Sequence, residues 1–255
     1  MKKLFSIVLT VLMLAALLAG CGSSQSMTIE EGKLYMSTNA AFPPYEMTND
    51  AGQVVGIDVD IAQALAEKLG LQLEVMDMDF DAALLAVQQG KADIVLAGVT
   101  VTPDRKMVMD FSNGYAHGIQ KVIVKAGSDV TMDNLGEKMI GCQRGTTGHI
   151  YASDTPENGG YGEDHVIAYD DGATAIQALN NGQIDCVIID EEPAKAYVAA
   201  NPGLTILDGT WVEEEYAIGI AKGNTQLVEA INKALEELTA DGTIPSIIAN
   251  YISAN

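Results

Sequence analysis

The segment AVQQGKADIVLA, residues 86–97, decides the fold, because it returns 92 residues later as ALNNGQIDCVII, residues 178–189. Both copies read as a helix end, a glycine, an aspartate and an apolar strand, with Ala, Gly, Asp and Val at the same places. An unbroken apolar strand is typical of a parallel sheet covered on both faces. Any αβ unit would supply the glycine and the strand, but the shared Asp and Val favour a repeat. Two copies are too few for a solenoid, so we predict two similar α/β lobes.

The first lobe extends outward from the first copy as alternating strands and helices. We expect strands over 33–38, 71–76 and 94–98, and a loop with two prolines over 39–50. A helix capped by Asp58 or Asp60 and closed by Gly70 is predicted from its apolar stripe, which consists of Val59, Ala62, Ala66 and Leu69. A second helix begins at Asp81 and is closed by Gly90.

The second lobe repeats this order around the second copy. We predict a strand over 138–143, a glycine-rich loop over 144–148, a helix started by Asp171 and a strand over 186–190. Two helices end the chain, one over 225–240 and one from Pro245, which suits a first turn. The stretches 119–124 and 216–221 would cross between the lobes as a two-strand hinge. Lobe one is then 28–118 with 217–255, and lobe two is 119–216.

The N-terminal segment has the pattern of a secretory signal. Lys2 and Lys3 precede an apolar run over 4–18, and small residues lead to Cys21. The run is shorter than the about 20 residues of a membrane span, although a short membrane anchor is the alternative. The sequence LAGC resembles a bacterial lipobox. That resemblance implies a signal peptide over 1–20, cleavage before Cys21, a lipid such as diacylglycerol or palmitate on its sulfur, and a tether over 21–27.

The net charge restricts the partners. The 255 residues carry a formal charge of −21, which argues against nucleic acid, because nucleic acid requires a basic footprint. It also argues against a basic membrane-binding face. The three histidines at 117, 149 and 165 are scattered without metal-ligand spacing. We therefore expect no metal and no cofactor.

Polar side chains gather where the predicted strands end. Ligands of open α/β sheets bind outside the carboxyl ends of the strands, so two facing lobes would bring these residues to one cleft. The cation is Arg105 and the anion is Asp190, and a guanidinium matches a carboxylate as a fork of two hydrogen bonds. We therefore predict a receptor for a zwitterion. The other expected cleft residues are Asn39, Phe42, Phe80, Gly98, Thr100, Gln143 and Thr147.

The chain resembles the extracytoplasmic solute-binding proteins of polar amino-acid ABC transporters, bacterial family 3 type, over nearly all of the mature length. The motifs are TNAAFPPYE (38–46), VVGIDVDIAQALAEKLG (54–70), GKADIVLAGVTVTPDRKMVMDFSNGY (90–115), GTTG (145–148), IDCVIID (184–190) and TADGTIPSII (239–248). The resemblance implies a periplasmic-binding-protein type II fold, in which each lobe is a mostly parallel sheet flanked by helices. It also implies a lipid-anchored monomer outside the cytoplasm that delivers a free amino acid to a membrane permease.

The resemblance also implies a role for each site residue. Arg105 would hold the ligand α-carboxylate, helped by the backbones of Thr100 and Thr147. The α-ammonium would meet the Gly98 carbonyl, the Thr100 hydroxyl and Asp190. Phe42 and Phe80 would enclose the ligand side chain, with Asn39 and Gln143 at its end.

Two departures from the family pattern bear on the ligand. Relatives that take arginine, lysine or histidine often have an acid at the place of Asn39 and a serine at the place of Ala97. Phe42 and Phe80 could still stack on a guanidinium plane. An uncharged ligand such as glutamine fits Asn39 and Gln143 as well, so the sequence leaves both open.

Each site residue also has a purely structural interpretation. Arg105 could be a surface arginine paired with Asp104 or Asp110, and Asp190 could cap a helix that continues into Glu191 and Glu192. The two phenylalanines could be core residues, Asn39 could make an Asx turn, and Thr146 and Thr147 could only shape their loop. The acidic run over 213–215 is expected to be a solvated turn.

The two cysteines that follow Cys21 are expected to be buried free thiols. If Gln143 and Asp190 end adjacent parallel strands, Cys142 and Cys186 are offset by three residues, or about 10 Å. A disulfide needs Cα atoms within roughly 7 Å.

An enzyme on the same scaffold is the main alternative function, such as a dehydratase acting on a cyclic carboxylic acid. Glu46 would be its nearest acid or base. A ligand-sensing module is a third alternative. The aromatic pair and the ammonium partner favour binding.

Overall fold

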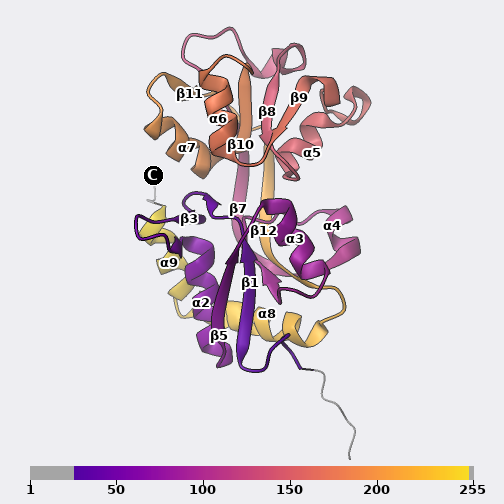
Figure 1. Ribbon diagram of the computed structural model, residues 1–255, viewed down its shortest axis with the longest axis vertical. Helices are drawn as coiled ribbons and strands as arrows, with labels where there is room; N and C mark the ends of the chain where they lie inside the picture. The colour runs from indigo at the N-terminus through magenta and orange to yellow at the C-terminus, as the bar shows by residue number, and fades with distance from the viewer. Residues whose placement is uncertain (1–25, 253–255) are drawn as a thin grey trace, which may run out of the picture.

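The protein forms two α/β lobes joined by a pair of long strands (Figure 1), and the computed structural model describes residues 26–252. The main sheet has nine strands in the order β5-β1-β6-β12-β7-β10-β8-β9, with β11 paired to β7. This confirms the predicted two-lobed α/β architecture and its two-strand connection. The predicted signal, Cys21 and most of the tether lie outside the described residues.

Lobe one is built on three parallel strands covered by helices. β1 (Lys33–Thr38) pairs in parallel with β5 (Gln72–Asp77) and β6 (Ile94–Val95). The helices of this lobe are α2 (Ile57–Leu69), α3 (Phe80–Gln88), α4 (Pro103–Val108), α8 (Thr225–Ala240) and α9 (Thr243–Tyr251). A small antiparallel sheet contains β2 (Ala41–Phe42), β3 (Glu46–Thr48) and β4 (Val54–Val55).

Lobe two has the same parallel core. β8 (Ile140–Gln143) pairs with β9 (Val166–Tyr169) and β10 (Cys186–Asp190), and β11 (Leu204–Ile206) joins the sheet through β7. The helices are α5 (Thr147–Ser153), α6 (Gly172–Asn180) and α7 (Glu191–Ala200). Three short 3₁₀ turns are η1 (Met132–Glu137), η2 (Pro156–Asn158) and η3 (Glu163–His165).

The strands that connect the lobes are β7 (Met109–Lys125) and β12 (Val212–Ala221), which pair antiparallel. Figure 1 shows both running from one lobe to the other. Their register shifts twice, between Tyr216 and Ala217 and between Ala217 and Gly219. Such irregularities bend and twist a strand pair locally.

The repeated aspartate has the same structural role in both lobes. Asp93 accepts a hydrogen bond from the Tyr35 N–H at 2.8 Å, while its own N–H donates to the Tyr35 carbonyl. Asp185 accepts from the Met139 N–H at 2.8 Å and donates to the Met139 carbonyl. Each aspartate therefore ties the strand of the repeat to the first parallel strand of its lobe, which explains why both copies keep it.

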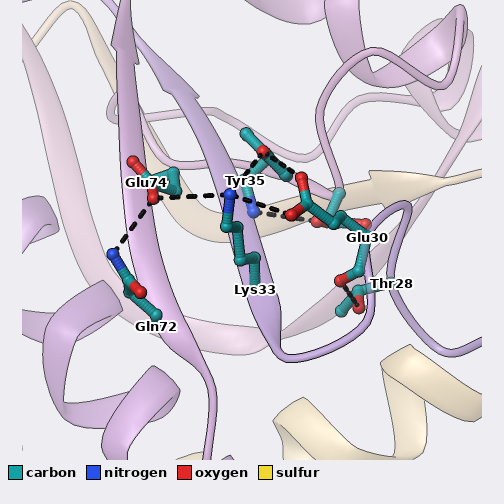
Figure 2. Close-up of polar contacts among 7 residues, drawn as sticks. Thr28, Glu30, Lys33, Tyr35, Gln72 and Glu74 are labelled. Carbon is teal, nitrogen blue, oxygen red and sulfur yellow. Dashed lines mark hydrogen bonds and ion pairs between the residues drawn. The ribbon is translucent and has the colours of Figure 1, made fainter.

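The outer end of β1 carries an exposed polar network (Figure 2). Lys33 Nζ lies 2.9 Å from Glu30 Oε1 and 3.9 Å from Glu74 Oε1, and the Tyr35 hydroxyl donates to Glu30 Oε2 at 2.6 Å. Exposed pairs of this kind contribute about 0–1 kcal/mol. The network therefore matters less to the fold than the buried aspartate beside it.

Several predicted boundaries of lobe one are wrong. α2 is capped by Gly56 and begins at Ile57, because Asp58 points inward and accepts a hydrogen bond from the Gly98 N–H. α3 is capped by Asp79 rather than Asp81. The strand expected over 94–98 ends at Val95, although all of its first three residues are buried.

Two predictions near the C-terminal part also need correction. α9 begins at Thr243, so Pro245 lies inside its first turn rather than at its start. The acidic run over 213–215 is not a turn, because it belongs to β12, and Glu214 is buried. The caps at Gly70 and Asp171 are confirmed: Gly70 is left-handed with φ 70°, and Asp171 accepts from the Thr174 N–H at 2.7 Å.

Cys142 and Cys186 are both free and buried, as predicted. The register pairs Cys186 with Ile140, so the offset from Cys142 is two residues rather than three. Burial raises the pKa of both thiols, that of Cys186 to about 12. A protonated buried thiol is chemically inert, so these cysteines are core residues.

Candidate functional site

A cavity with about 330 Å³ of empty space lies between the lobes. It contains all nine residues that the sequence brings to the cleft, in addition to Glu46, Ala97 and Thr146. The nine are Asn39, Phe42, Phe80, Gly98, Thr100, Arg105, Gln143, Thr147 and Asp190. Since they come from strand ends and loops of both lobes, the cavity exists only where the lobes face each other.

Arg105 is held in the cavity wall by a short helix. Thr102 caps α4 by accepting from the Arg105 N–H, and the Arg105 side chain is turned inward, with the residue 8% exposed. Its guanidinium donates to the Thr100 carbonyl at 2.8 Å and to the Gly145 carbonyl of lobe two at 3.1 Å. A guanidinium has five N–H donors, so this group has donors to offer a ligand.

The surface interpretation of Arg105 is wrong. Asp110 pairs instead with Lys222, at 2.7 Å. The Arg105 guanidinium lies 5.4 Å from the centre of the Phe80 ring, within the range of a cation–π contact. Phe80 therefore contacts the guanidinium as well as lining the cavity.

Asp190 is the buried anion of the cavity. It is the last residue of β10 and stands at the cap position of α7, as the structural interpretation expected. Its carboxylate, however, accepts from Gln120 Nε2 at 2.7 Å and from the Tyr216 hydroxyl. Burial first, and the charge of Glu214 second, raise the pKa of Asp190 to about 7.

Two side-chain amides meet across the lobes at another part of the cavity wall. Gln143 Nε2 donates to Asn39 Oδ1 at 2.8 Å, and Asn39 Nδ2 donates to the Met78 carbonyl at 2.9 Å. The Asn39 side chain is therefore engaged between lobes rather than in an Asx turn. Thr146 does shape its loop, since its hydroxyl accepts from the His149 N–H and caps α5.

Phe42 and Phe80 are both core and cavity residues. Each belongs to a buried apolar cluster and also lines the cavity. Gly98, at φ +53°, lies against the Phe42 ring, and a Cβ there would be 2.8 Å from it. Any side chain at position 98 would therefore displace the aromatic wall.

Four polar residues that surround these groups were not predicted as site residues. They are Glu46, Asp58, Gln120 and Glu214. Glu46 was considered only as a catalytic acid on a loop, but it lies in β3, is 1% exposed and reaches the cavity. Burial and the neighbouring Asp58 raise the pKa of Glu46 well above its usual value, and burial raises that of Asp58 to about 6.

A sequence signal for Glu214 exists in hindsight. In VEEEYAIGIA, strand alternation places Glu214 on the same face as Tyr216 and Ile218, which are buried.

Within residues 26–252, no group of three or more His, Cys, Asp or Glu side chains is arranged to hold a metal. The same range contains no helix of the length and apolarity needed to cross a membrane.

A buried guanidinium and a buried carboxylate in one inter-lobe cavity define a two-lobed binding protein for a small charged ligand. The model of the bacterial extracellular solute-binding proteins, family 3, matches residues 34–254, and the chain belongs to that family.

Named relatives cover nearly the same length. The arginine-binding extracellular protein ArtP of Bacillus subtilis (strain 168) is 33% identical over 237 residues, which cover 90% of each chain. An ancestral arginine-binding protein bound to arginine has a TM-score of 0.81 and 39% identity, over 87% of this chain and 99% of that one. An ancestral arginine-binding protein bound to glutamine has a TM-score of 0.81 and 38% identity, over 88% of this chain and 100% of that one.

Proposed function

We propose that this protein binds a free polar L-amino acid between its lobes and delivers it to an ABC permease for import. The observation that carries the proposal is the placement of Arg105 and Asp190, both buried, on one inter-lobe cavity. A free amino acid is the smallest common ligand with both a carboxylate and an ammonium. Membership of the solute-binding family and the named amino-acid-binding relatives support the same ligand class.

In this proposal each end of the ligand meets a different wall. The α-carboxylate lies on Arg105, beside the backbones of Thr100 and Thr147. The α-ammonium donates to the Gly98 carbonyl, the Thr100 hydroxyl and Asp190. The Gly98 N–H already donates to Asp58 at 3.0 Å, which fixes the peptide on that side.

The ligand side chain would pass between Phe42 and Phe80 toward Asn39 and Gln143. Asn39 Nδ2 donates to the Met78 carbonyl, and Gln143 Nε2 donates to Asn39 Oδ1 and to the Asp170 carbonyl. The Gln143 oxygen and the second lone pair of Asn39 Oδ1 therefore suit a side chain that donates hydrogen bonds, as both a guanidinium and a carboxamide do. This fits the binding of arginine and of glutamine by similar proteins, and we propose both as ligands to test.

The test is thermal unfolding with a panel of L-amino acids. Ligand at about 100 times Kd adds roughly 2.7 kcal/mol to the free energy of unfolding, which shifts Tm by several degrees. Arg105→Ala should abolish the shift, because it removes the carboxylate partner. Arg144→Ala is the matched control: that arginine is exposed, is absent from the cavity lining and should leave the shift unchanged. A flat response to every amino acid contradicts the proposal.

We infer further that the protein is not an enzyme. Glu46, the other cavity acid beside Asp190, is buried next to Asp58, and burial raises its pKa well above the usual value. A wall of unreactive aromatic rings suits retention of a ligand rather than turnover. Product analysis after incubation with the bound amino acid should return it unchanged.

We also propose where the mature protein is located, how it is modified and that it is a monomer. We propose cleavage before Cys21, lipid attachment to its sulfur and a monomer tethered outside the cytoplasm. The lobe limits 28–118 with 217–255, and 119–216, are supported by the register shift that follows Tyr216. Cys21→Ser should convert the membrane-bound protein to a released one in cell fractionation.

A further inference from the structure

A second acidic residue lies directly behind Asp190. Asp190 is 7% exposed and Glu214 is 8% exposed, and the amide of Gln120 bridges them. Gln120 Nε2 donates to Asp190 Oδ2 at 2.7 Å and to Glu214 Oε2 at 3.0 Å. Asp190 lines the cavity and Glu214 does not, so Glu214 acts on a ligand only through its neighbours.

Glu214 controls which hydrogen-bonding groups face the cavity. The Thr100 hydroxyl donates its single hydrogen to Glu214 Oε2 at 3.0 Å, so its oxygen is left as an acceptor. The two hydrogens of the Gln120 amide are used by the two acids, and the Tyr216 hydroxyl donates to Asp190. The wall around Asp190 therefore offers acceptors to a ligand, which is the polarity an ammonium group needs.

Neither acid forms an ion pair in the described part of the chain, although burial lowers the pKa of Arg105 and the charge of Glu214 acts against that lowering. None of the ion pairs within residues 26–252 includes Asp190 or Glu214. Glu214 Oε1 and Gln120 Oε1 are buried and meet no donor within the same range. Two carboxylates that share a buried site repel each other, and such a pair retains a proton more readily than one exposed acid does.

We propose that Glu214 is a positioning residue of the ammonium site, and that its charge behind Asp190 makes Asp190 hold a proton that leaves when the ligand ammonium enters. The inference rests on the proposed function. In this step a carboxylic acid O–H bond breaks, the proton passes to water, and the ammonium N–H groups donate to the carboxylate. No covalent bond to the ligand forms.

The surroundings of Asp190 favour this exchange. Burial first, and Glu214 second, raise its pKa to about 7, while Tyr216 and Gln120 lower it. Arg105 is the nearest cation among the cavity residues, but it is directed to carbonyl groups. The other titratable groups packed around Asp190 are Tyr45, Glu46 and Asp58 of lobe one, Tyr115 and His117 of β7, and Glu191 and Glu192 of α7.

The test counts protons by isothermal titration calorimetry in buffers of different ionisation heat, with L-arginine and L-glutamine as probes. For the amino acid that binds, we expect release of nearly one proton at pH 6 and of almost none at pH 8.5. Affinity should rise up to about tenfold per pH unit between pH 5 and 6.5. No proton release at pH 6 would overturn the inference but leave the proposed function standing. If neither these probes nor any other L-amino acid of the thermal panel binds, the proposed function fails as well.

Variants at position 214 test whether Glu214 causes the proton release. Glu214→Gln keeps the shape and removes the repelling charge, so proton release at pH 6 should fall by about half or more. Glu214→Asp keeps a carboxylate and should retain most of the release. Glu213→Gln is the matched control, since Glu213 is the exposed neighbour in β12 and should behave as wild type. Equal release by wild type and Glu214→Gln contradicts the role of Glu214. The wild-type proton count decides the exchange even where a variant does not fold.

Discussion

At the scale of single residues, the site is distinguished by charges that the protein has removed from water. Asp110 and Lys222 form a partly exposed ion pair, whereas Arg105, Asp190 and Glu214 are buried without such a pair. Burying an unpaired charge is expensive. The folded protein therefore keeps an unfavourable arrangement that a ligand with opposite charges can relieve.

The stability of the ligand-free protein should depend on pH through Asp190. Its folded-state pKa of about 7 exceeds the usual 3.8 of an aspartate, so the folded protein binds the proton more tightly than the unfolded chain. The stabilising contribution is complete below about pH 4 and is lost as pH rises through 7. At about 1.36 kcal/mol per pKa unit, the loss is on the order of 4 kcal/mol.

Thermal unfolding of Asp190→Asn without ligand measures this contribution. The variant should lose less stability than wild type between pH 5 and pH 8, because a neutral side chain has no charge to bury. Asp50→Asn, an exposed change, should follow wild type. Parallel pH curves for wild type and Asp190→Asn contradict the assignment.

The nine residues predicted for the cleft all line the cavity, because strand ends and family motifs both point to that edge. The sequence did not identify Glu214 as a site residue, because three consecutive glutamates suggest a solvated turn. Only the pairing of β12 with β7 makes the run a strand and turns the middle glutamate inward. The alternation in VEEEYAIGIA is a local sign of this orientation, but the pairing that makes the run a strand joins segments about a hundred residues apart.

At the scale of elements, helix existence and type were predictable while helix starts were not. Asp58 and Asp60 both lie in the first turn of α2, and acids are favoured there whether or not they cap the helix. Which residue begins the helix depends on the long-range hydrogen bond from the Gly98 N–H to the Asp58 side chain. The repeated aspartates were visible in the sequence, but their bonds to Tyr35 and Met139 required the fold.

The hinge strands also carry a prediction at this scale. A Cβ at Gly118 of β7 would lie 2.6 Å from Asp190 Oδ1 and would also meet the Tyr216 hydroxyl. Gly118→Ala should therefore shift Asp190 and weaken amino-acid binding about tenfold or more, as measured by calorimetry. Gly136→Ala is the control, because its Cβ would make only an ordinary 3.5 Å contact with Tyr161. Unchanged affinity in Gly118→Ala would argue that Asp190 is not at the ammonium.

At the scale of the whole molecule, the two lobes are in contact across the cavity. Among the hydrogen bonds of the described residues that cross the cleft away from the hinge strands are those of Gln143 to Asn39 at 2.8 Å, Arg105 to the Gly145 carbonyl at 3.1 Å, and the Tyr197 hydroxyl to the Ala41 carbonyl at 3.0 Å. A ligand favours the arrangement in which the lobes touch only through contacts that the ligand does not make when the lobes are apart. The hydrogen bonds between the lobes therefore contribute to the equilibrium between the open and closed forms before any ligand binds.

Removing one of these bonds should favour the open form. Gln143→Ala deletes the bond to Asn39, so the ligand-free protein should show a larger radius of gyration by small-angle X-ray scattering. Saturating ligand should restore most of the compact state through Arg105 and Asp190. Gln183→Ala, an exposed glutamine of lobe two, is the control and should match wild type. An unchanged radius in Gln143→Ala shows that this bond does not contribute to closure.

The most direct test of the account is a crystal structure of the protein with its bound amino acid. We expect the α-carboxylate to lie within about 3 Å of the Arg105 guanidinium, a hydrogen-bond distance, and the α-ammonium at the same distance from Asp190. An amino acid bound in the reverse orientation, or outside the cavity between the lobes, would contradict it.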